Sequence, residues 1–296
     1  MKKLHILAVA ALALGACDDV SGSDDDRDSG AVFTTNNAAS ANFVIAFTRD
    51  ENGTLTRRDS VATGGRGSGP HPIFNTDPLE SQDAVILSDD RRFLFVVNAG
   101  SNEVSSFRVD DDGALSLVSR VSSGGQFPVS LAHRAGLLYT VNANGGGSIS
   151  GFRVGADGAL TALANSTRPL SGAAMPGPGS IRISPDARVL VVTEKPTNLL
   201  VVYPLATDGT PGARALVASP GPTPFGADFD PSGRYILSQG NIGPMRAAVP
   251  DGSTVSSSTL SGTGLAAITA AAATTETAAC WIEITPDGRF AYTTNT

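Results

Sequence analysis

The chain has few of the residue patterns that mark known hydrolytic sites. It contains no Gly-x-Ser-x-Gly nucleophile elbow, no His-Glu-x-x-His metal motif, no phosphate-binding glycine loop and no paired-cysteine motif. His71 and His133 are the two histidines beyond the first sixteen residues, and we interpret both as loop residues, His133 as a solvated one. A cysteine nucleophile needs a base beside it. No histidine is evidently placed to activate Cys280, so we interpret it as a buried or pocket-lining thiol.

Glu194 is the carboxylate whose place in the chain most suggests acid–base chemistry. The chain repeats a strand–turn–strand unit, and at the place of Glu194 the other copies carry amides or glycine: Asn36, Asn98, Asn142, Gly240 and Asn295. Asparagine and glycine suit a strand end that bends into a turn, and glutamate does not. Partial burial beside Phe225 or Trp281 would raise the pKa of Glu194 towards a useful range. The alternative is a surface glutamate in a weak ion pair with Lys195.

A degenerate repeat of about fifty residues must position these side chains. Two apolar strands flank a tight turn at 88–92, 132–136, 184–188, 230–234 and 285–289, and Phe33 marks a sixth copy that lacks its upstream strand. A second turn follows at Asn52-Gly53, Asp112-Gly113, Asp157-Gly158, Asp208-Gly209 and Asp251-Gly252. Two hairpins per repeat predict an all-β fold, a β-propeller of four-stranded antiparallel blades. We expect the run from Gly262 to Ala279 to be a loop between blades.

One copy of the repeat carries a specific resemblance. Residues 94–109, LFVVNAGSNEVSSFRV, followed by Asp112-Gly113-Ala114-Leu115, resemble the Tyr-Val-Thr-Asn-type repeat of the seven-bladed lactonase-like propellers. That family includes bacterial 6-phosphogluconolactonase and fungal carboxymuconate cyclase. The stretches 192–195, 221–226 and 279–281 resemble a secreted branch of it. The resemblance implies a catalytic glutamate at the strand end that Glu194 occupies; the histidine and arginine that accompany it in the family have no clear match here.

Propeller geometry places Glu194 at one mouth of the central axis. The innermost strand of each blade starts at one face, and the second strand returns to that face. Glu194, at the end of a second strand, should therefore lie near the residues that lead into the innermost strands. These predicted binding residues are Gln82, Asp83, Gln126, Phe127, Ser180, Phe225, Cys280 and Trp281. Such a mixture of polar and aromatic groups is typical of small-molecule pockets.

The repeat count sets the expected domain organisation. Residues 31–296 form the propeller domain, with five outer hairpin turns and a sixth copy that stops two strands into its blade. A seven-bladed ring needs roughly eighty more residues at this period, so we expect about five to six blades and a domain that is incomplete at its C-terminus.

The N-terminus predicts export. Lys2 and Lys3 precede an apolar stretch too short to span a bilayer, and Leu14-Gly15-Ala16-Cys17 resembles a bacterial lipobox. We expect residues 1–17 to be a lipoprotein signal peptide with Cys17 lipidated, the alternative being ordinary signal cleavage beside a chance cysteine. Residues 18–30, rich in Asp, Ser and Gly, then form an acidic tether. The expected location is the periplasm, anchored to the membrane.

Composition narrows the function. A net charge of −7 without a basic cluster argues against a nucleic-acid partner. We expect a monomer with no cofactor and no metal ion that hydrolyses a lactone at the mouth, with Glu194 as acid/base. Export and the absence of a basic phosphate clamp favour an extracellular or periplasmic lactone over a sugar phosphate. The alternative is a non-catalytic propeller, tethered to the membrane, that binds a ligand or a protein partner at the same mouth.

Overall fold

The computed structural model describes residues 30–71, 77–243 and 247–295 of the chain. In these ranges all regular structure is β-strand, and the strands form six separate antiparallel sheets. No helix there is long and apolar enough to cross a membrane. The predicted signal segment with Cys17, and the acidic tether up to residue 29, lie outside the described residues.

Each sheet is one blade, and the chain runs through the blades in order. The first three are blade 1, β1 (Gly30–Thr35), β2 (Phe43–Arg49) and β3 (Leu55–Ala62); blade 2, β4 (Val85–Leu87), β5 (Phe93–Asn98), β6 (Glu103–Val109) and β7 (Leu115–Ser122); and blade 3, β8 (Gln126–Arg134), β9 (Leu137–Asn144), β10 (Ser148–Val154) and β11 (Leu160–Ala162), with β12 (Arg168–Pro169) also paired to β10. The others are blade 4, β13 (Pro178–Ile183), β14 (Val189–Glu194), β15 (Leu199–Pro204) and β16 (Ala215–Ala218); blade 5, β17 (Pro224–Phe229), β18 (Arg234–Gln239), β19 (Thr254–Ser261) and β20 (Gly264–Ala273); and blade 6, β21 (Ile282–Ile284) and β22 (Ala291–Thr293).

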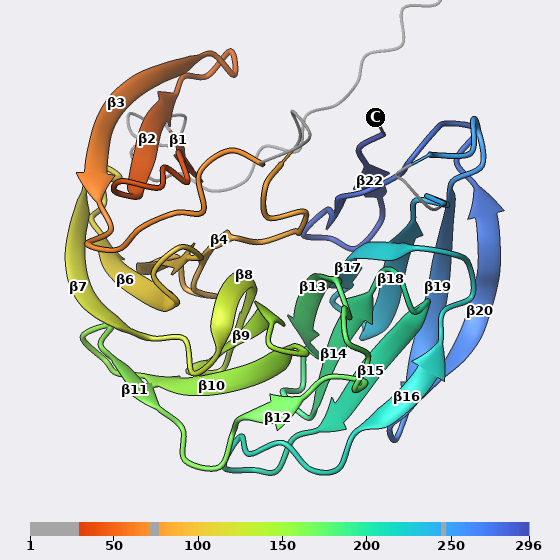
Figure 1. Cartoon of the computed structure of the whole chain (residues 1–296). Coiled ribbons are helices and arrows are strands. Elements are labelled where there is room, and N and C mark those ends of the chain that lie inside the picture. Colours follow the sequence, from red (N-terminus) through yellow and green to blue (C-terminus); the bar gives the residue numbers. More distant parts are fainter. Residues whose placement is uncertain (1–29, 72–76, 244–246, 296) are drawn as a thin grey trace, which may run out of the picture.

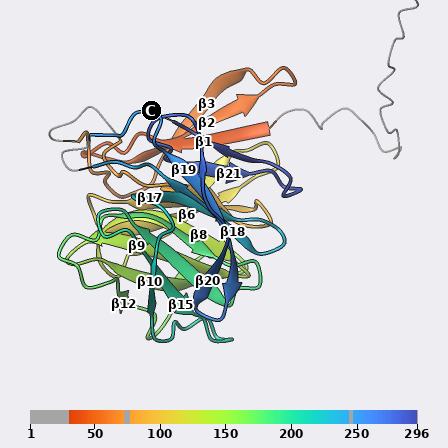
Figure 2. The same ribbon diagram turned by 90° about the vertical axis from the view of Figure 1, so that its right-hand side faces the viewer.

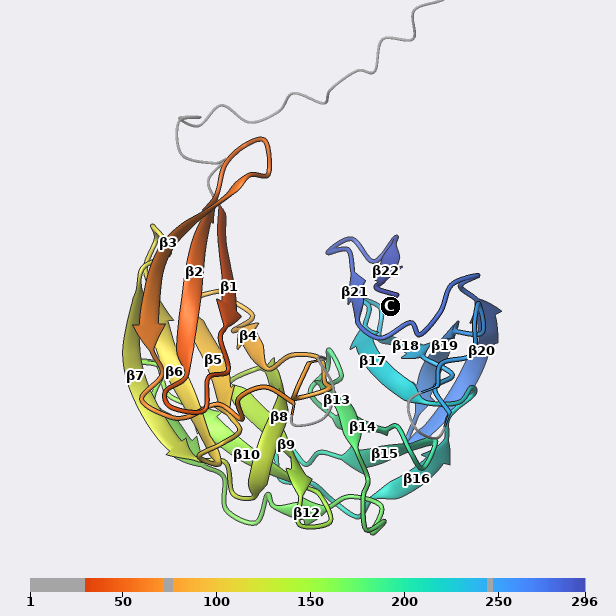
Figure 3. The same ribbon diagram turned by 45° about the horizontal axis from the view of Figure 1, so that its top comes forward.

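The blades stand around a common axis with their first strands innermost (Figure 1). In a tilted view they form an arc that is open between blade 1 and blade 6 (Figure 3), and a side view shows their successive stacking (Figure 2). Within the described residues blade 1 has three strands and no innermost one, as the copy at Phe33 predicts, and Phe33 lies in β1, which pairs with β2. The predicted all-β propeller is confirmed.

Apolar packing between neighbouring sheets holds the arc together. The second strands β5 and β14 are buried along their whole length because a blade covers each face of them. One core cluster joins blades 2, 3 and 4, a second joins blades 4 and 5, and a third joins blades 1 and 2. Strands buried on both faces need continuous apolar runs, which explains sequences such as FLFVVN and VLVVTE.

The Asp-Gly turns predicted from the sequence have a packing role between blades. Gly158 and Gly209 adopt φ values of 88° and 82°, which side chains other than glycine rarely tolerate. A Cβ on Gly158 would lie 2.4 Å from the Phe93 ring, and one on Gly209 would lie 2.5 Å from Leu137. Each turn therefore fits against the second strand of the preceding blade, and glycine is required there for both reasons.

Blade 5 departs from the predicted turn pattern. Asp251-Gly252 does not join the third and fourth strands, because it lies before β19, and the turn between β19 and β20 is at Gly262, with φ 61°. The prediction of a loop from Gly262 to Ala279 is therefore wrong, because this run contains the ten-residue strand β20. This strand lies at the outer edge of its sheet and is mostly exposed, so it carries no apolar alternation that would reveal it.

A test of the polar packing within the arc is to change Asn98 to alanine. Asn98 is fully buried; its Oδ1 accepts hydrogen bonds from Asn42 and Thr63, and its Nδ2 donates one to Ser105. The substitution leaves these groups unpaired, so the free energy of unfolding in urea should fall by about 2–4 kcal/mol. Asn52→Ala, at an exposed turn, is the matched control and should change it by less than about 0.5 kcal/mol. Equal effects of the two variants would contradict this assignment.

Candidate functional site

Glu194 belongs to a set of buried polar residues, one at the end of the second strand in each of blades 2 to 5. Cross-strand pairing aligns it with Asn98, Asn142 and Gln239, and all four are fully buried. The sequence prediction that Gly240 is the blade 5 equivalent is wrong. The turn between β17 and β18 is one residue shorter than its counterpart in blade 4, so Gln239 pairs with Pro224 as Glu194 pairs with Pro178.

The carboxylate of Glu194 is held by two donors. Its Oε1 accepts a hydrogen bond of 2.9 Å from the Ser171 backbone N–H, and its Oε2 accepts one of 2.8 Å from the Thr197 hydroxyl. In blades 2 and 5 the equivalent amide donates to a serine on the third strand, from Asn98 to Ser105 and from Gln239 to Ser256. Blade 4 has Val201 at that place. An acceptor-only side chain therefore suits Glu194, because valine offers no acceptor to an amide.

Lys195, the next residue, reaches the mouth that the sequence analysis predicted. Its ammonium donates a hydrogen bond to the Glu80 carbonyl, lies 3.8 Å from Oε2 of Glu80, and stands 4.6 Å from the centre of the Phe225 ring. His71 lies beside the other carboxylate oxygen of Glu80, and its Nε2 is 3.7 Å from Oε1. The ion pair of Lys195 is thus with Glu80, and the surface pairing with Glu194 considered from the sequence is wrong.

Burial shapes the protonation of this cluster. Desolvation lowers the pKa of Lys195 to about 8, and the nearby Cys280 and Asp77 act in the opposite direction. Burial also raises the pKa of the Cys280 thiol, although Lys195 opposes the rise. The Sγ of Cys280 donates to the Ala278 carbonyl at 3.1 Å. Cys280 is therefore a neutral thiol at neutral pH, and burial brings the pKa of Lys195 closer to neutral pH than that of an exposed lysine.

The segment that crosses the mouth, residues 77–83, contains two left-handed residues other than glycine, Glu80 with φ 50° and Asp83 with φ 66°. Left-handed residues also precede the innermost strands of blades 4 to 6, at Gly177, Thr223 and Ala278. Strained backbone of this kind persists where surrounding contacts hold it, and it is common at functional sites.

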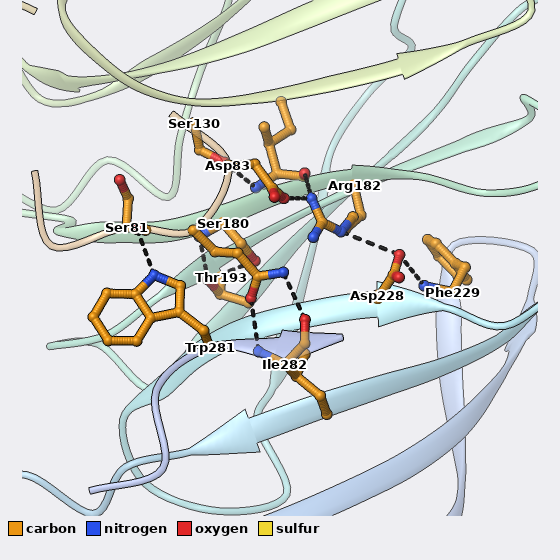
Figure 4. Close-up of polar contacts among 12 residues, drawn as sticks. Ser81, Asp83, Ser130, Ser180, Arg182, Thr193, Asp228, Phe229, Trp281 and Ile282 are labelled. Carbon is orange, nitrogen blue, oxygen red and sulfur yellow. Dashed lines mark hydrogen bonds and ion pairs between the residues drawn. The ribbon is translucent and has the colours of Figure 1, made fainter. Parts of the chain in front are cut away.

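Contacts across the axis fix the 77–83 segment. Gln82 donates from Nε2 to the Ile282 carbonyl at 2.8 Å and accepts from the Ile282 N–H at 3.0 Å. The indole N–H of Trp281 donates to the Ser81 carbonyl at 2.9 Å (Figure 4). Trp281 also meets Phe225 edge to face, with ring centres 5.8 Å apart. Blade 2 is thus fastened to blade 6 directly beside Lys195.

A charged group lies further along the axis. Arg182 on β13 forms ion pairs with Asp83 and, from Nε at 3.3 Å, with Asp228 on β17 (Figure 4). Arg182, Asp228 and Glu283 occupy the same strand position in blades 4, 5 and 6, where blades 2 and 3 have Ile86 and Ala132. Burial, and then the Asp228 charge, raise the pKa of Glu283.

The structure brings together only part of the predicted mouth. Gln82, Phe225, Cys280 and Trp281 surround the Lys195 cluster, and Asp83 faces Arg182. Ser180 is fully buried and bonds to Thr193. Gln126 is exposed, and Phe127 packs against the core of blades 2 to 4. We therefore leave both out of the site.

Sequence reasoning missed Lys195, Glu80 and Arg182; it placed His71 correctly in a loop but misjudged His133, which lies in β8. One signal for Lys195 was available: next to the aligned strand ends, the other blades carry the small residues Ala99, Ala143 and Gly240. No sequence pattern connects Glu80 to Lys195, because 115 residues separate them. His133 is not solvated: its side chain is 7% exposed and stacks on Phe95, with Nδ1 3.3 Å from Asp89.

Two cavities flank the 77–83 segment, which separates them. One of about 650 Å³ lies beside β1 and is bounded by Asn36, Asn37, Gly69, Pro70 and Asp77. The other, about 410 Å³, lies between β4 and blade 6 and is bounded by Gln82, Asp83, Trp281, Glu283 and Tyr292. Both volumes suit a small organic molecule. Within the described residues, no group of three or more His, Cys, Asp or Glu side chains is arranged to hold a metal ion.

Comparisons with known proteins support the fold. Residues 40–136 match the family model described as "Lactonase, 7-bladed beta-propeller". An uncharacterized protein of Staphylococcus aureus is 35% identical over 91 residues, which are 30% of this chain and 27% of that protein. The match thus spans about a quarter of the relative's length, and the activity of the whole protein is a matter for proposal.

Solved structures of the same architecture cover most of the chain. A putative 6-phosphogluconolactonase from Bacteroides uniformis superposes with a TM-score of 0.66 at 20% identity, over 92% of this chain and 76% of that one. The Pseudomonas aeruginosa periplasmic gluconolactonase gives 0.62 at 20% identity, over 90% and 75%. The resemblance to the lactonase-like propellers is confirmed at the level of fold, and residues 40–136 carry it in sequence.

A double substitution tests the structural role of Glu194. Glu194→Gln keeps one acceptor oxygen but places amide hydrogens against the other donor, Ser171 or Thr197, so it should lower the free energy of unfolding by about 1–3 kcal/mol. Adding Val201→Ser restores the acceptor found in blades 2 and 5. The double variant should be more stable than the sum of the single effects by more than about 0.5 kcal/mol.

Urea unfolding measures these differences. Val44→Ser, a buried valine in blade 1, is the control partner, and its effect should add to that of Glu194→Gln without coupling. Additive behaviour of Glu194→Gln with Val201→Ser would contradict the idea that the neighbouring valine explains the glutamate.

Proposed function

We propose that this lactonase-like propeller hydrolyses a lactone or a related cyclic ester at the mouth cluster of Lys195, Glu80 and His71. The observation that carries the proposal is the convergence of a buried ammonium, a carboxylate and an imidazole at one end of the axis. They come from blade 4 and from the connection between blades 1 and 2, so only the assembled arc brings them together. The gluconolactonase names borne by structures of this fold agree with such a reaction.

Each group has a role in ester cleavage. Water attacks the lactone carbonyl, the carbonyl oxygen becomes an oxyanion, and the ring oxygen leaves with a proton. Glu80 and His71, 3.7 Å apart, are suited to take the proton from water and deliver it to the ring oxygen. The Lys195 ammonium, held in a site with little water, is suited to stabilise the oxyanion.

The sequence prediction that Glu194 is the acid/base stays a prediction. Its two carboxylate oxygens are occupied by Ser171 and Thr197, and it is fully buried, so proton transfer from it would require the Thr197 hydroxyl to move aside. Our proposal instead assigns it the task of fixing the turn that carries Lys195. If this role is right, the Glu194→Gln, Val201→Ser double variant should fold and retain turnover.

The pH dependence of turnover tests the proposal. A panel of glucono-δ-lactone, γ-butyrolactone and dihydrocoumarin, corrected for spontaneous hydrolysis, should contain at least one substrate. Because the oxyanion needs a protonated lysine, kcat/KM should fall as the pH rises above about 8, the pKa to which burial lowers Lys195. In Lys195→Arg this fall should disappear below pH 10, since guanidinium stays charged.

Variants of the proposed base complete the test. Glu80→Gln should lower kcat/KM by about a hundredfold or more, because general acid–base catalysis contributes about that much. Asp111→Asn, an exposed turn carboxylate far from the mouth in sequence, is the control and should leave turnover unchanged. Full activity in Glu80→Gln would remove the mechanism, and no turnover of any lactone would remove the function.

A binding role without catalysis is the second candidate. It is favoured by the closed state of the cluster, in which Lys195 is capped by the Glu80 carbonyl and only 12% of its side chain is exposed. A protein partner recovered at this mouth, together with failure of the lactone panel, would support that role.

We also infer that the chain is exported and anchored through a lipid on Cys17, on the basis of its lipobox-like sequence. In a bacterial host, the full chain should sediment with membranes and partition into detergent. Cys17→Ser should shift it to the soluble or unprocessed fraction, whereas Cys280→Ser, the matched control, should not. Equal membrane association of the two variants would contradict the anchor.

A further inference from the structure

Lys195 is exceptional in the composition of the chain. The sequence contains eighteen arginines but only three lysines, and two of these are at positions 2 and 3. From position 4 onward, every side chain that is a fixed cation at neutral pH, apart from Lys195, is arginine. The one lysine of the propeller domain lies at the mouth. Only 12% of its side chain is exposed, so it does not serve as a solvated surface cation.

The chemistry of the two residues explains what such a choice provides. A guanidinium stays protonated in proteins, whereas an amine can lose its proton and offer a lone pair. Desolvation is the established means of making a lysine nucleophilic. At the mouth the ammonium lies over the face of Phe225 and beside the neutral thiol of Cys280, and burial lowers its pKa to about 8.

The contacts of Lys195 leave its nitrogen oriented for attack. One N–H donates to the Glu80 carbonyl, which fixes the amine against the 77–83 segment. In the neutral amine the lone pair then points away from that carbonyl. Cys280 does not compete as a nucleophile, because burial holds its thiol protonated and its Sγ donates to Ala278.

We propose that Lys195 is a nucleophilic amine that captures small carbonyl compounds, aldehydes or ketones, as an imine. The nitrogen forms a bond to the carbonyl carbon and the oxygen takes up a proton, which gives a carbinolamine. Loss of that oxygen as water then forms the C=N bond, so amine and carbonyl yield imine and one water. No oxidant or other reactant is required.

Neighbouring groups supply the proton transfers. Water leaves the carbinolamine only after protonation, and the His71–Glu80 pair stands next to the amine, with Oε2 of Glu80 3.8 Å from Nζ. Phe225 and Trp281 meet edge to face beside the amine, and Trp281 also lines the cavity of about 410 Å³ between β4 and blade 6. A small planar carbonyl compound, such as an aromatic aldehyde, suits an aromatic lining better than a long or charged one.

Reductive trapping tests the proposal and needs no lactone turnover, so it is independent of the proposed function. The full chain is incubated with pyridoxal and sodium cyanoborohydride between pH 6 and 11, and the modified peptides are identified by mass spectrometry. We expect an adduct on Lys195 that reaches half its maximal rate near pH 8. The same chain unfolded in urea should require about pH 10, the pKa of a free lysine.

Three variants make the result specific. Lys195→Arg should give no adduct within the propeller domain, since residues 4–296 contain no other lysine. Glu80→Gln keeps the amine but removes the carboxylate, and should slow trapping at pH 8 by about tenfold or more. His133→Gln, whose ring lies on blade 3 against Phe95, is the control and should not change the rate. A Lys195 that stays unmodified at pH 8 in the folded chain, or that reacts no faster than in urea, would overturn the proposal.

Discussion

The burial of the second strands of blades 2 to 5 between neighbouring sheets is the constraint from which the other features follow. Blades packed against each other leave no water between them, so a polar side chain at the inner end of such a strand must find its partners within the protein. Asn98, Asn142, Glu194 and Gln239 meet this requirement in blades 2 to 5. Their hydrogen bonds reach the third strand of the same blade and the connection from the preceding blade, so one polar position holds together the segments that surround the mouth.

The repeat made most of the fold predictable. Asp, Pro and Gly at fixed offsets located the inner hairpin turns, and Phe33 identified a blade that lacks its first strand. Prediction failed for β20, which pairs with one neighbouring strand at the exposed edge of its sheet. Because it is mostly exposed, its alanines and threonines show no alternation of apolar and polar residues. It failed also by one residue in blade 5, where a shorter turn moves the alignment from Gly240 to Gln239.

The candidate site was predictable only in outline. Geometry correctly placed Phe225, Cys280 and Trp281 near the end of β14, because strand directions in a blade are fixed. The search for a residue that breaks the repeat pointed to Glu194. However, the neighbouring strand of that blade has Val201 where blades 2 and 5 have a serine, so the change from amide to carboxylate has a structural explanation. The residue that breaks the pattern without such a partner is Lys195, and its carboxylate comes from a connection whose path no local sequence signal specifies.

The cross-axis bonds between Gln82 and Ile282 have a consequence for biogenesis. They join residues 200 positions apart, so this closure has a very large sequence separation and is slow to form compared with the local hairpins. The early blades form first, and the 77–83 segment then has its partners in blades 3 and 4, since Gln82 and Asp83 bond to the backbone of Gly179 and Leu131. Its contacts with Trp281 and Ile282 can form only after blade 6 has appeared. The backbone beside Lys195 is therefore held from one side of the axis until the last blade described here is in place.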